Sequence, residues 1–219
     1  MHGFCARAPE GARLRSARAL VFLALLVAVP ALPTRSAAQV GGPRLHLGAG
    51  MALDFGGHVE LDRGPTFNHG EDSLRATVGL RGHLDYGVLR YLSVGGLVRM
   101  SWWEPEWTPS IGRSFLLDLC PRVTGHYDLR HFRFYGGMAP GLTISAVGDR
   151  GIAVSNPAAG FTLALTVAGV EWWFRRKIGV FAELGWVGHW FSHDNDRSLG
   201  GLDFRLSQGL FEFGLVFGV

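Results

Sequence analysis

Apolar residues occupy every second position in long stretches of the chain between Arg44 and Val219, and each stretch ends at a break rich in Gly, Pro, Asp and Asn. The clearest stretch is 44–55, where every odd-numbered position from 45 to 55 is apolar. Because side chains alternate between the two faces of a β-strand, such a stretch has one apolar face and one face of small and polar residues. The pattern predicts an all-β fold.

Eight segments follow this pattern. In chain order they are 44–55, 73–86, 91–103, 113–127, 131–145, 161–174, 178–191 and 203–219. The breaks between them alternate strictly in length, with long breaks at 56–72, 104–112, 146–160 and 192–202 and short ones at 87–90, 128–130 and 175–177. We therefore expect an eight-stranded antiparallel up-and-down transmembrane β-barrel, with its short turns and both termini at one end. A one-position shift of the apolar pattern near Gly169 predicts a β-bulge.

The first 38 residues have the features of a cleavable signal peptide. A basic leader precedes an apolar core at 19–29, and small residues at 36–38 precede Gln39. The leader holds five of the 21 Lys and Arg residues and one of the 18 acidic residues, so the remaining chain is nearly neutral and gives no evidence of nucleic-acid binding. Cys120 is then a lone cysteine that can form no intramolecular disulfide. We expect a signal peptide at 1–38 and one barrel domain at 39–219.

The non-apolar face of the segments carries charged residues among many glycines and alanines, and the chain beyond the leader has a single lysine. A narrow lumen favours small residues and Arg–carboxylate pairs, whereas a solvated exterior favours long flexible charges. This argues against a lipocalin-like barrel, in which the apolar face would point inward. An eight-stranded barrel is just wide enough for its own side chains, and buried charges must be paired, so we expect a polar network in the lumen. Its predicted members are Arg75, Arg81, Asp85, Arg99, Asp118, Arg122, Arg133, Glu171, Glu183 and Glu212.

Large aromatic residues gather near the ends of the segments. Amphipathic rings favour the two interfaces of a bilayer, so this placement predicts two aromatic girdles. The predicted girdle beside the short turns comprises Tyr86, Tyr91, Tyr127, Trp172 and Trp173, and that toward the long loops comprises Trp102, Trp103, Trp107, Trp186 and Trp190.

The last segment alternates to its end, with Phe211, Phe213, Leu215, Phe217 and Val219 on one face. Together with the eight segments and the leader, it resembles the small eight-stranded outer-membrane barrels of bacteria, the OmpA-transmembrane, OmpX and OmpW-like families. The resemblance implies a location in the outer membrane, contact with membrane lipid and lipopolysaccharide, and recognition by the barrel-assembly machinery. One departure is the final Val219, where the family usually ends in Phe or Trp.

Enzymes of lipid A also occur among small outer-membrane barrels, and the deacylase resembles a Ser-His-Glu hydrolase. His189, Ser192, His193 and Glu212 supply the residue types of such a site, but the order Ser192-His193-Asp194-Asn195 departs from the deacylase signature. The acidic run beginning at Asp194 lacks the glycine and the final glutamate of a calcium loop. His58, His69, Glu71 and Asp72 have no fixed metal-ligand spacing. We expect no catalytic site, no cofactor and no metal.

The expected function is that of a non-enzymatic outer-membrane barrel that acts structurally or binds and adheres through its surface loops. Two alternatives remain open, a narrow OmpW-like channel for small solutes and a lipid A-modifying enzyme similar to the deacylase. The sequence does not identify a ligand for the loops.

Overall fold

The computed structural model describes residues 45–62, 70–106, 111–149, 157–193 and 202–219, so the predicted signal peptide lies outside the described residues. All regular elements in these ranges are strands that form one antiparallel sheet. They are β1 (Leu45–Asp62), β2 (Gly70–Leu74), β3 (Thr77–Leu89), β4 (Leu92–Trp103), β5 (Ile111–Leu129), β6 (Phe132–Asp149), β7 (Ala158–Arg175), β8 (Ile178–His193) and β9 (Leu202–Gly218). Within the described residues, no helix is long and apolar enough to cross a membrane.

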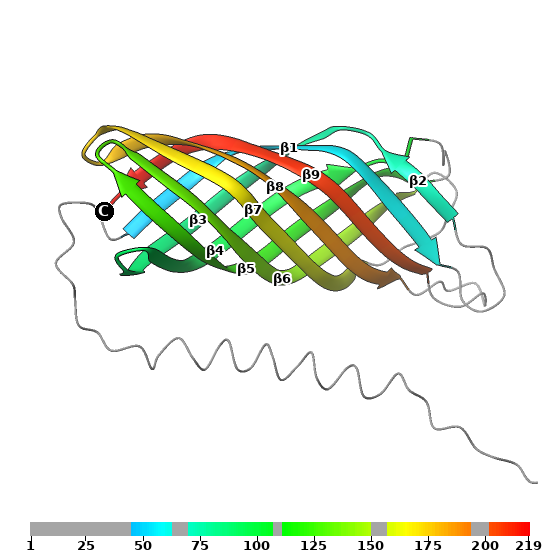
Figure 1. Cartoon of the computed structure of the whole chain (residues 1–219). Coiled ribbons are helices and arrows are strands. Elements are labelled where there is room, and N and C mark those ends of the chain that lie inside the picture. Colours follow the sequence, from blue (N-terminus) through cyan, green and yellow to red (C-terminus); the bar gives the residue numbers. More distant parts are fainter. Residues whose placement is uncertain (1–44, 63–69, 107–110, 150–156, 194–201) are drawn as a thin grey trace, which may run out of the picture. The chain divides into compact units, whose positions relative to one another are not determined.

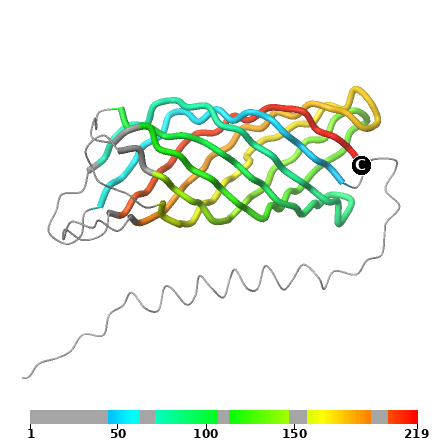
Figure 2. The backbone as a smooth tube through the Cα atoms, turned by 180° about the vertical axis from the view of Figure 1, so that it is seen from behind, coloured from blue at the N-terminus to red at the C-terminus, as the bar shows by residue number. Residues whose placement is uncertain are grey.

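The sheet closes on itself through pairing between β1 and β9, as Figures 1 and 2 show. β2 and β3 both pair with β1 in one continuous register, from Gly57 opposite Leu74 to Asp54 opposite Thr77, and are separated only by Arg75 and Ala76. They therefore form one wall strand with a short interruption. The structure confirms the predicted eight-stranded antiparallel up-and-down barrel.

Polarity alternates across the wall of the barrel as the sequence predicted. Leu80 on β3 is 51% exposed on the outside, whereas its neighbour Arg81 is 4% exposed inside the barrel. Exposed apolar side chains of the same kind occur on every wall strand, for example Leu47, Val98, Leu142, Leu184 and Leu215. An exterior of this composition would be unstable in water, because a soluble protein rarely exposes large continuous apolar patches. The exterior is therefore suited to lipid.

Among the register shifts of the sheet, two bulges, on β7 and β1, bear on the predicted strands. On β7, Thr166 lies opposite Gly185 and Ala168 opposite Leu184, so Val167 is an extra residue and is 75% exposed. This confirms the bulge predicted near Gly169. On β1, the register to β9 shifts between Phe55 and His58, and Gly56 adopts a positive φ of 57° that glycine tolerates without strain.

The β1 bulge corrects the predicted end of the first strand. The pattern placed a long break at 56–72, but β1 continues to Asp62 and pairs with β2. Beyond the bulge the polarity of the two faces is reversed, with Val59 buried inside and His58 exposed outside. We call this end of the barrel the collar; it comprises 57–62, 70–74, 202–207 and the adjoining ends of β4, β5 and β8.

Two prolines interrupt the ladder between β5 and β6. The pairing runs as far as Leu119 opposite Leu142 and resumes, with the same offset, at Val123 opposite Met138. Pro121 and Pro140 lie opposite each other at the centre of this interruption. Proline has no backbone N–H, so neither residue can donate to the carbonyl of the other. The wall therefore lacks two hydrogen bonds at a depth where lipid offers no substitute.

Replacing either proline by valine should therefore stabilise the barrel. Each substitution restores one N–H donor, and we expect Pro121→Val or Pro140→Val to raise the free energy of unfolding by about 1 kcal/mol. Urea unfolding in lipid vesicles, followed by the loss of the folded band on an unheated gel, measures this change. Pro157→Val is the matched control, because Pro157 precedes β7 and interrupts no ladder. A gain no larger than that of the control would contradict the prediction.

Candidate functional site

The lumen of the barrel is the most highly organised part of the molecule, and Glu183 on β8 is its most connected residue. Its Oε1 accepts hydrogen bonds from Arg81 Nη2 at 2.7 Å, Arg122 Nη2 at 2.6 Å and the Tyr135 hydroxyl at 2.7 Å. The Thr166 hydroxyl donates to its Oε2 at 2.9 Å. Donors from four other strands thus meet one carboxylate that is 3% exposed.

Each arginine of this group also binds a second carboxylate. Arg81 Nη1 donates to Glu212 on β9, and Arg122 Nη1 donates to Asp85 Oδ2 on β3 at 2.7 Å. The Arg81 guanidinium further lies 5.1 Å from the centre of the Phe181 ring, a cation–π distance. Two arginines are therefore paired with three carboxylates. We call Arg81, Asp85, Arg122, Glu183 and Glu212 the central ion cluster.

A second group of charges lies between the central ion cluster and the collar. Arg99 on β4 donates to Asp54 on β1, and its Nη1 lies 3.8 Å from Asp118 Oδ2 on β5. The same Asp118 oxygen lies 3.0 Å from His189 Nε2 on β8. The four side chains connect four wall strands across the lumen, and all are at most 2% exposed.

A third group lies toward the short turns. Arg133 on β6 donates through Nε to Asp128 Oδ1 at 2.7 Å, and its Nη1 lies 2.9 Å from His46 Nδ1 on β1. His46 in turn lies 3.2 Å from Glu171 Oε2 on β7, which also accepts the Trp173 indole N–H at 3.1 Å. Charged side chains thus cross the lumen at this level too.

Nine of the ten residues predicted for the polar network are buried in these three groups. The exception is Arg75, whose side chain is 57% exposed and lies 3.5 Å from Glu104. Arg75 sits at the interruption between β2 and β3, where the alternation on which the prediction relied does not hold. The prediction also omitted several lumen residues, although they occupy positions on the same non-apolar face: His46, Asp54, Tyr135 and His189.

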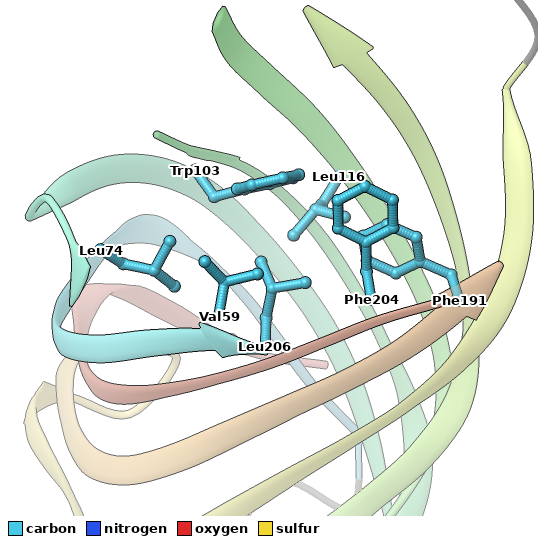
Figure 3. Close-up of a cluster of buried hydrophobic side chains, with 7 residues drawn as sticks. All are labelled: Val59, Leu74, Trp103, Leu116, Phe191, Phe204 and Leu206. Atoms are coloured by element: carbon cyan, nitrogen blue, oxygen red, sulfur yellow. The ribbon is translucent and has the colours of Figure 1, made fainter. Parts of the chain in front are cut away.

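The inside of the collar is apolar, as Figure 3 shows for seven side chains. Phe191 and Phe204 stack with their ring centres 5.2 Å apart, and the Trp103 ring lies 5.9 Å from that of Phe204. The remaining members are Val59, Leu74, Leu116 and Leu206. These seven residues, which we call the collar core, are at most 6% exposed and occupy the lumen at the long-loop end.

The predicted aromatic girdles need two corrections, and Trp107 lies outside the described residues. Trp173 faces the lumen, where its indole N–H donates to buried Glu171. Trp103 is fully buried in the collar core rather than exposed to lipid. It follows Trp102 directly on β4, and adjacent residues on a strand face opposite sides of the wall, so only one of the two can face outward. The other predicted girdle residues are exposed or partly exposed on the outer surface: Tyr86, Tyr91, Trp102, Tyr127, Trp172, Trp186 and Trp190.

The residues considered for catalysis are not brought together. His189 points into the lumen toward Asp118, whereas Ser192 is exposed and donates to Asp203 on the neighbouring strand. Glu212 binds Arg81 in the central ion cluster. The side chain of His193 and all of Asp194 and Asn195 lie outside what the structure describes.

The residues considered for metal binding in the first long break are not assembled into a site either. His58 lies 3.8 Å from Glu60, while His69 is outside the described ranges. Throughout the described part of the chain, no three His, Cys, Asp or Glu side chains are grouped so that they could hold a metal ion.

Comparison with known proteins identifies the fold. No family model and no curated protein matches the sequence. The structure is similar to the outer membrane protein OprG from Pseudomonas aeruginosa, with a TM-score of 0.55 and 9% identity over 83% of this chain and 98% of that one. The chain has the fold of an outer-membrane β-barrel. The outer membrane protein AlkL, determined in lipid bilayers, is similar with a TM-score of 0.51 and 11% identity over 86% of this chain and 95% of that one.

The outer membrane protease OmpT from Escherichia coli is a further similar structure, with a TM-score of 0.49 and 8% identity over 85% of this chain and all of that one. At such identities the likeness concerns the fold alone. Fold and apolar exterior together place this outer-membrane barrel in the outer membrane, in contact with its lipid.

The number of contacts to each buried carboxylate predicts the effect of removing its charge. Glu183→Gln should lower the free energy of unfolding by about 3–5 kcal/mol, because it leaves two buried guanidinium groups without their shared partner. Glu212→Gln should cost less, since Arg81 keeps Glu183. Urea unfolding of the folded barrel in vesicles measures both.

Glu60→Gln is the control for the charge change itself. Glu60 lies 3.8 Å from Arg205 at the surface of the collar, where an ion pair contributes about 0.2–1 kcal/mol. Equal losses for Glu183→Gln and Glu60→Gln would show that the central ion cluster does not stabilise the barrel.

Proposed function

We propose that this outer-membrane barrel is a closed, non-enzymatic scaffold that holds its collar and long loops outside the bilayer as a surface for binding, and that it conducts no solute. The observation that carries the proposal is the filled lumen. Three groups of ion-paired side chains and the collar core occupy it, together with a second buried apolar cluster formed by Leu97, Cys120, Ala139, Ala164 and Val187.

The ion-paired groups and the collar core each oppose the passage of a solute, for different physical reasons. A hydrated ion would have to separate arginine–carboxylate pairs that are nearly inaccessible to solvent, and separating a buried pair costs several kcal/mol. It would also have to enter the collar core, where the Trp103 indole N–H is the one polar side-chain group among the seven and cannot replace the water around an ion. An uncharged solute meets the same packed layers. Transport would therefore need the interior to rearrange.

The collar supports a binding role because it is built like a part of a soluble protein. Its outer surface is polar, with His58, Glu71 and Arg205 exposed, and its inside is the collar core. Such a segment is stable in water and unstable in lipid, so the wall of the barrel extends beyond the bilayer at the long-loop end. Loops that begin on this wall are held away from the membrane surface.

The proposal predicts that purified barrel in a planar bilayer gives no defined conductance steps. Insertion is verified independently by the different mobilities of unheated and heated samples recovered from the same vesicles. Reproducible single-channel steps from the folded protein would contradict the proposal and favour the narrow-channel alternative. A contaminating porin is recognised because its steps persist in preparations from cells that lack this chain.

Disrupting the collar core should disorder the collar while the rest of the barrel stays folded. Trp103→Ala removes the largest side chain of the collar core and should cost about 3–5 kcal/mol locally. In intact vesicles, trypsin should then cleave at Arg75 or Arg205, while the membrane-spanning strands remain resistant. Trp102→Ala is the control, since Trp102 faces outward on the same strand. Equal cleavage of both variants would argue that the collar core does not support the collar.

A further inference from the structure

The short-turn end of the barrel carries an exposed group of positive charges. Three turns join β3 to β4, β5 to β6 and β7 to β8, and each contains at least one exposed basic residue. These residues, which we call the basic rim, are Arg90, Arg130, Arg175, Arg176 and Lys177. None of the five forms an ion pair with any residue that the structure describes. Their charge is therefore available to an external partner.

Backbone hydrogen bonds connect the three turns into one rim. His126 N–H donates to the Tyr91 carbonyl at 2.9 Å, which connects the first turn to β5. Trp173 N–H donates to the His131 carbonyl at 2.7 Å, which connects the second turn to β7. Gly218 N–H donates to the Lys177 carbonyl at 3.0 Å, which connects the third turn to the last strand. The rim is thus a fixed edge of the barrel, at the end where Figure 1 marks the C-terminus.

Exposed aromatic side chains set the depth of the basic rim relative to lipid. Tyr91 directly follows Arg90 and is 64% exposed, and Tyr127 and Trp172 lie within three residues of Arg130 and Arg175. Such rings collect at the level of lipid headgroups. The cations lie just beyond them toward the turns, which is where the phosphate groups of the adjoining leaflet are located.

The collar differs from this end in the arrangement of its charges. There Arg75 lies 3.5 Å from Glu104, Arg205 lies 3.8 Å from Glu60, and acidic Glu71, Glu106 and Asp203 are also present. At the short-turn end, the exposed acidic side chain is Asp128, which binds Arg133, whereas Glu171 is buried in the lumen. Among the residues that the structure describes, unpaired positive charge is therefore concentrated at the short-turn end.

We propose that the basic rim binds the phosphate groups of anionic phospholipids in the leaflet that surrounds the short turns. Guanidinium groups donate two parallel hydrogen bonds to phosphate oxygens, and an ammonium group adds a point charge. Cations at a membrane surface attract anionic lipid strongly enough to select it from neutral lipid. The aromatic rings beside the cations favour a lipid over a soluble acidic partner, because they already hold this edge at the headgroups. The collar has no comparable group and should not select anionic lipid.

The test measures which lipid surrounds the folded barrel. The full chain is reconstituted in vesicles of phosphatidylcholine that contain one tenth phosphatidylglycerol, and spin-labelled versions of each lipid report the fraction held at the protein. We expect about a fivefold preference for phosphatidylglycerol at low salt, which weakens as added salt screens the charges. Replacing all five basic-rim residues by glutamine should remove the preference.

The control variant removes positive charge from the opposite end. It replaces three arginines together by glutamine: Arg75, Arg205 and the exposed Arg113 of β5, whose guanidinium lies 5.3 Å from the centre of the Trp102 ring. This variant should keep the preference of the native chain, and a gel shift on heating shows that each variant is folded. No preference in the native chain, or an equal loss in both variants, would overturn the proposal. The proposal would also be overturned if inorganic phosphate abolished the preference for phosphatidylglycerol while chloride at the same ionic strength did not. That result would indicate a site for a free anion.

Discussion

The interior of this barrel depends on one constraint, which is that charged side chains enclosed in the narrow lumen must be paired. A carboxylate in the lumen has neither bulk water nor lipid to stabilise it, so it must receive hydrogen bonds from side chains of other strands. Glu183 meets this requirement with donors from β3, β5, β6 and β7. Three of these contacts join strands that are not neighbours in the sheet, whereas Thr166 lies on β7, which is adjacent to β8. They supplement the backbone ladders, which connect only adjacent strands.

Much of the architecture follows from the sequence because one physical rule, alternation across a strand, applies along most of the chain. Leu80 and Arg81 illustrate the rule, since their opposite environments were predictable from their positions alone. The prediction fails where a residue is placed by its type instead of by alternation, or where the strand is interrupted. Trp103 was assigned to the lipid because it is large and aromatic and lies near a strand end, yet its position after Trp102 directs it inward. Arg75 was misplaced because an interruption in the wall strand turns it outward.

The partners of the buried charges could not be predicted in the same way. Alternation indicates that Arg122 and Glu183 face the lumen, but it does not indicate that they meet, because they lie on β5 and β8. Their meeting depends on how far each strand is shifted relative to the next around the closed barrel. That shift includes the bulges at Gly56 and Val167, and only the second leaves a clear signal in the sequence. The collar was missed for the same reason.

The bulge on β1 has a consequence for how such a protein can change during evolution. One extra residue there exchanges the inner and outer faces of the strand beyond it. Odd-numbered positions are therefore apolar throughout β1, facing lipid before the bulge and facing the inside of the collar after it. β9 makes the same transition without a bulge, by moving its apolar residues from even positions (Phe204, Leu206) to odd ones (Phe211, Phe213). Insertions of two residues can therefore lengthen the collar while preserving its faces. Insertion of a single residue would turn its core toward water, so the height of the collar is expected to vary among descendants in steps of two.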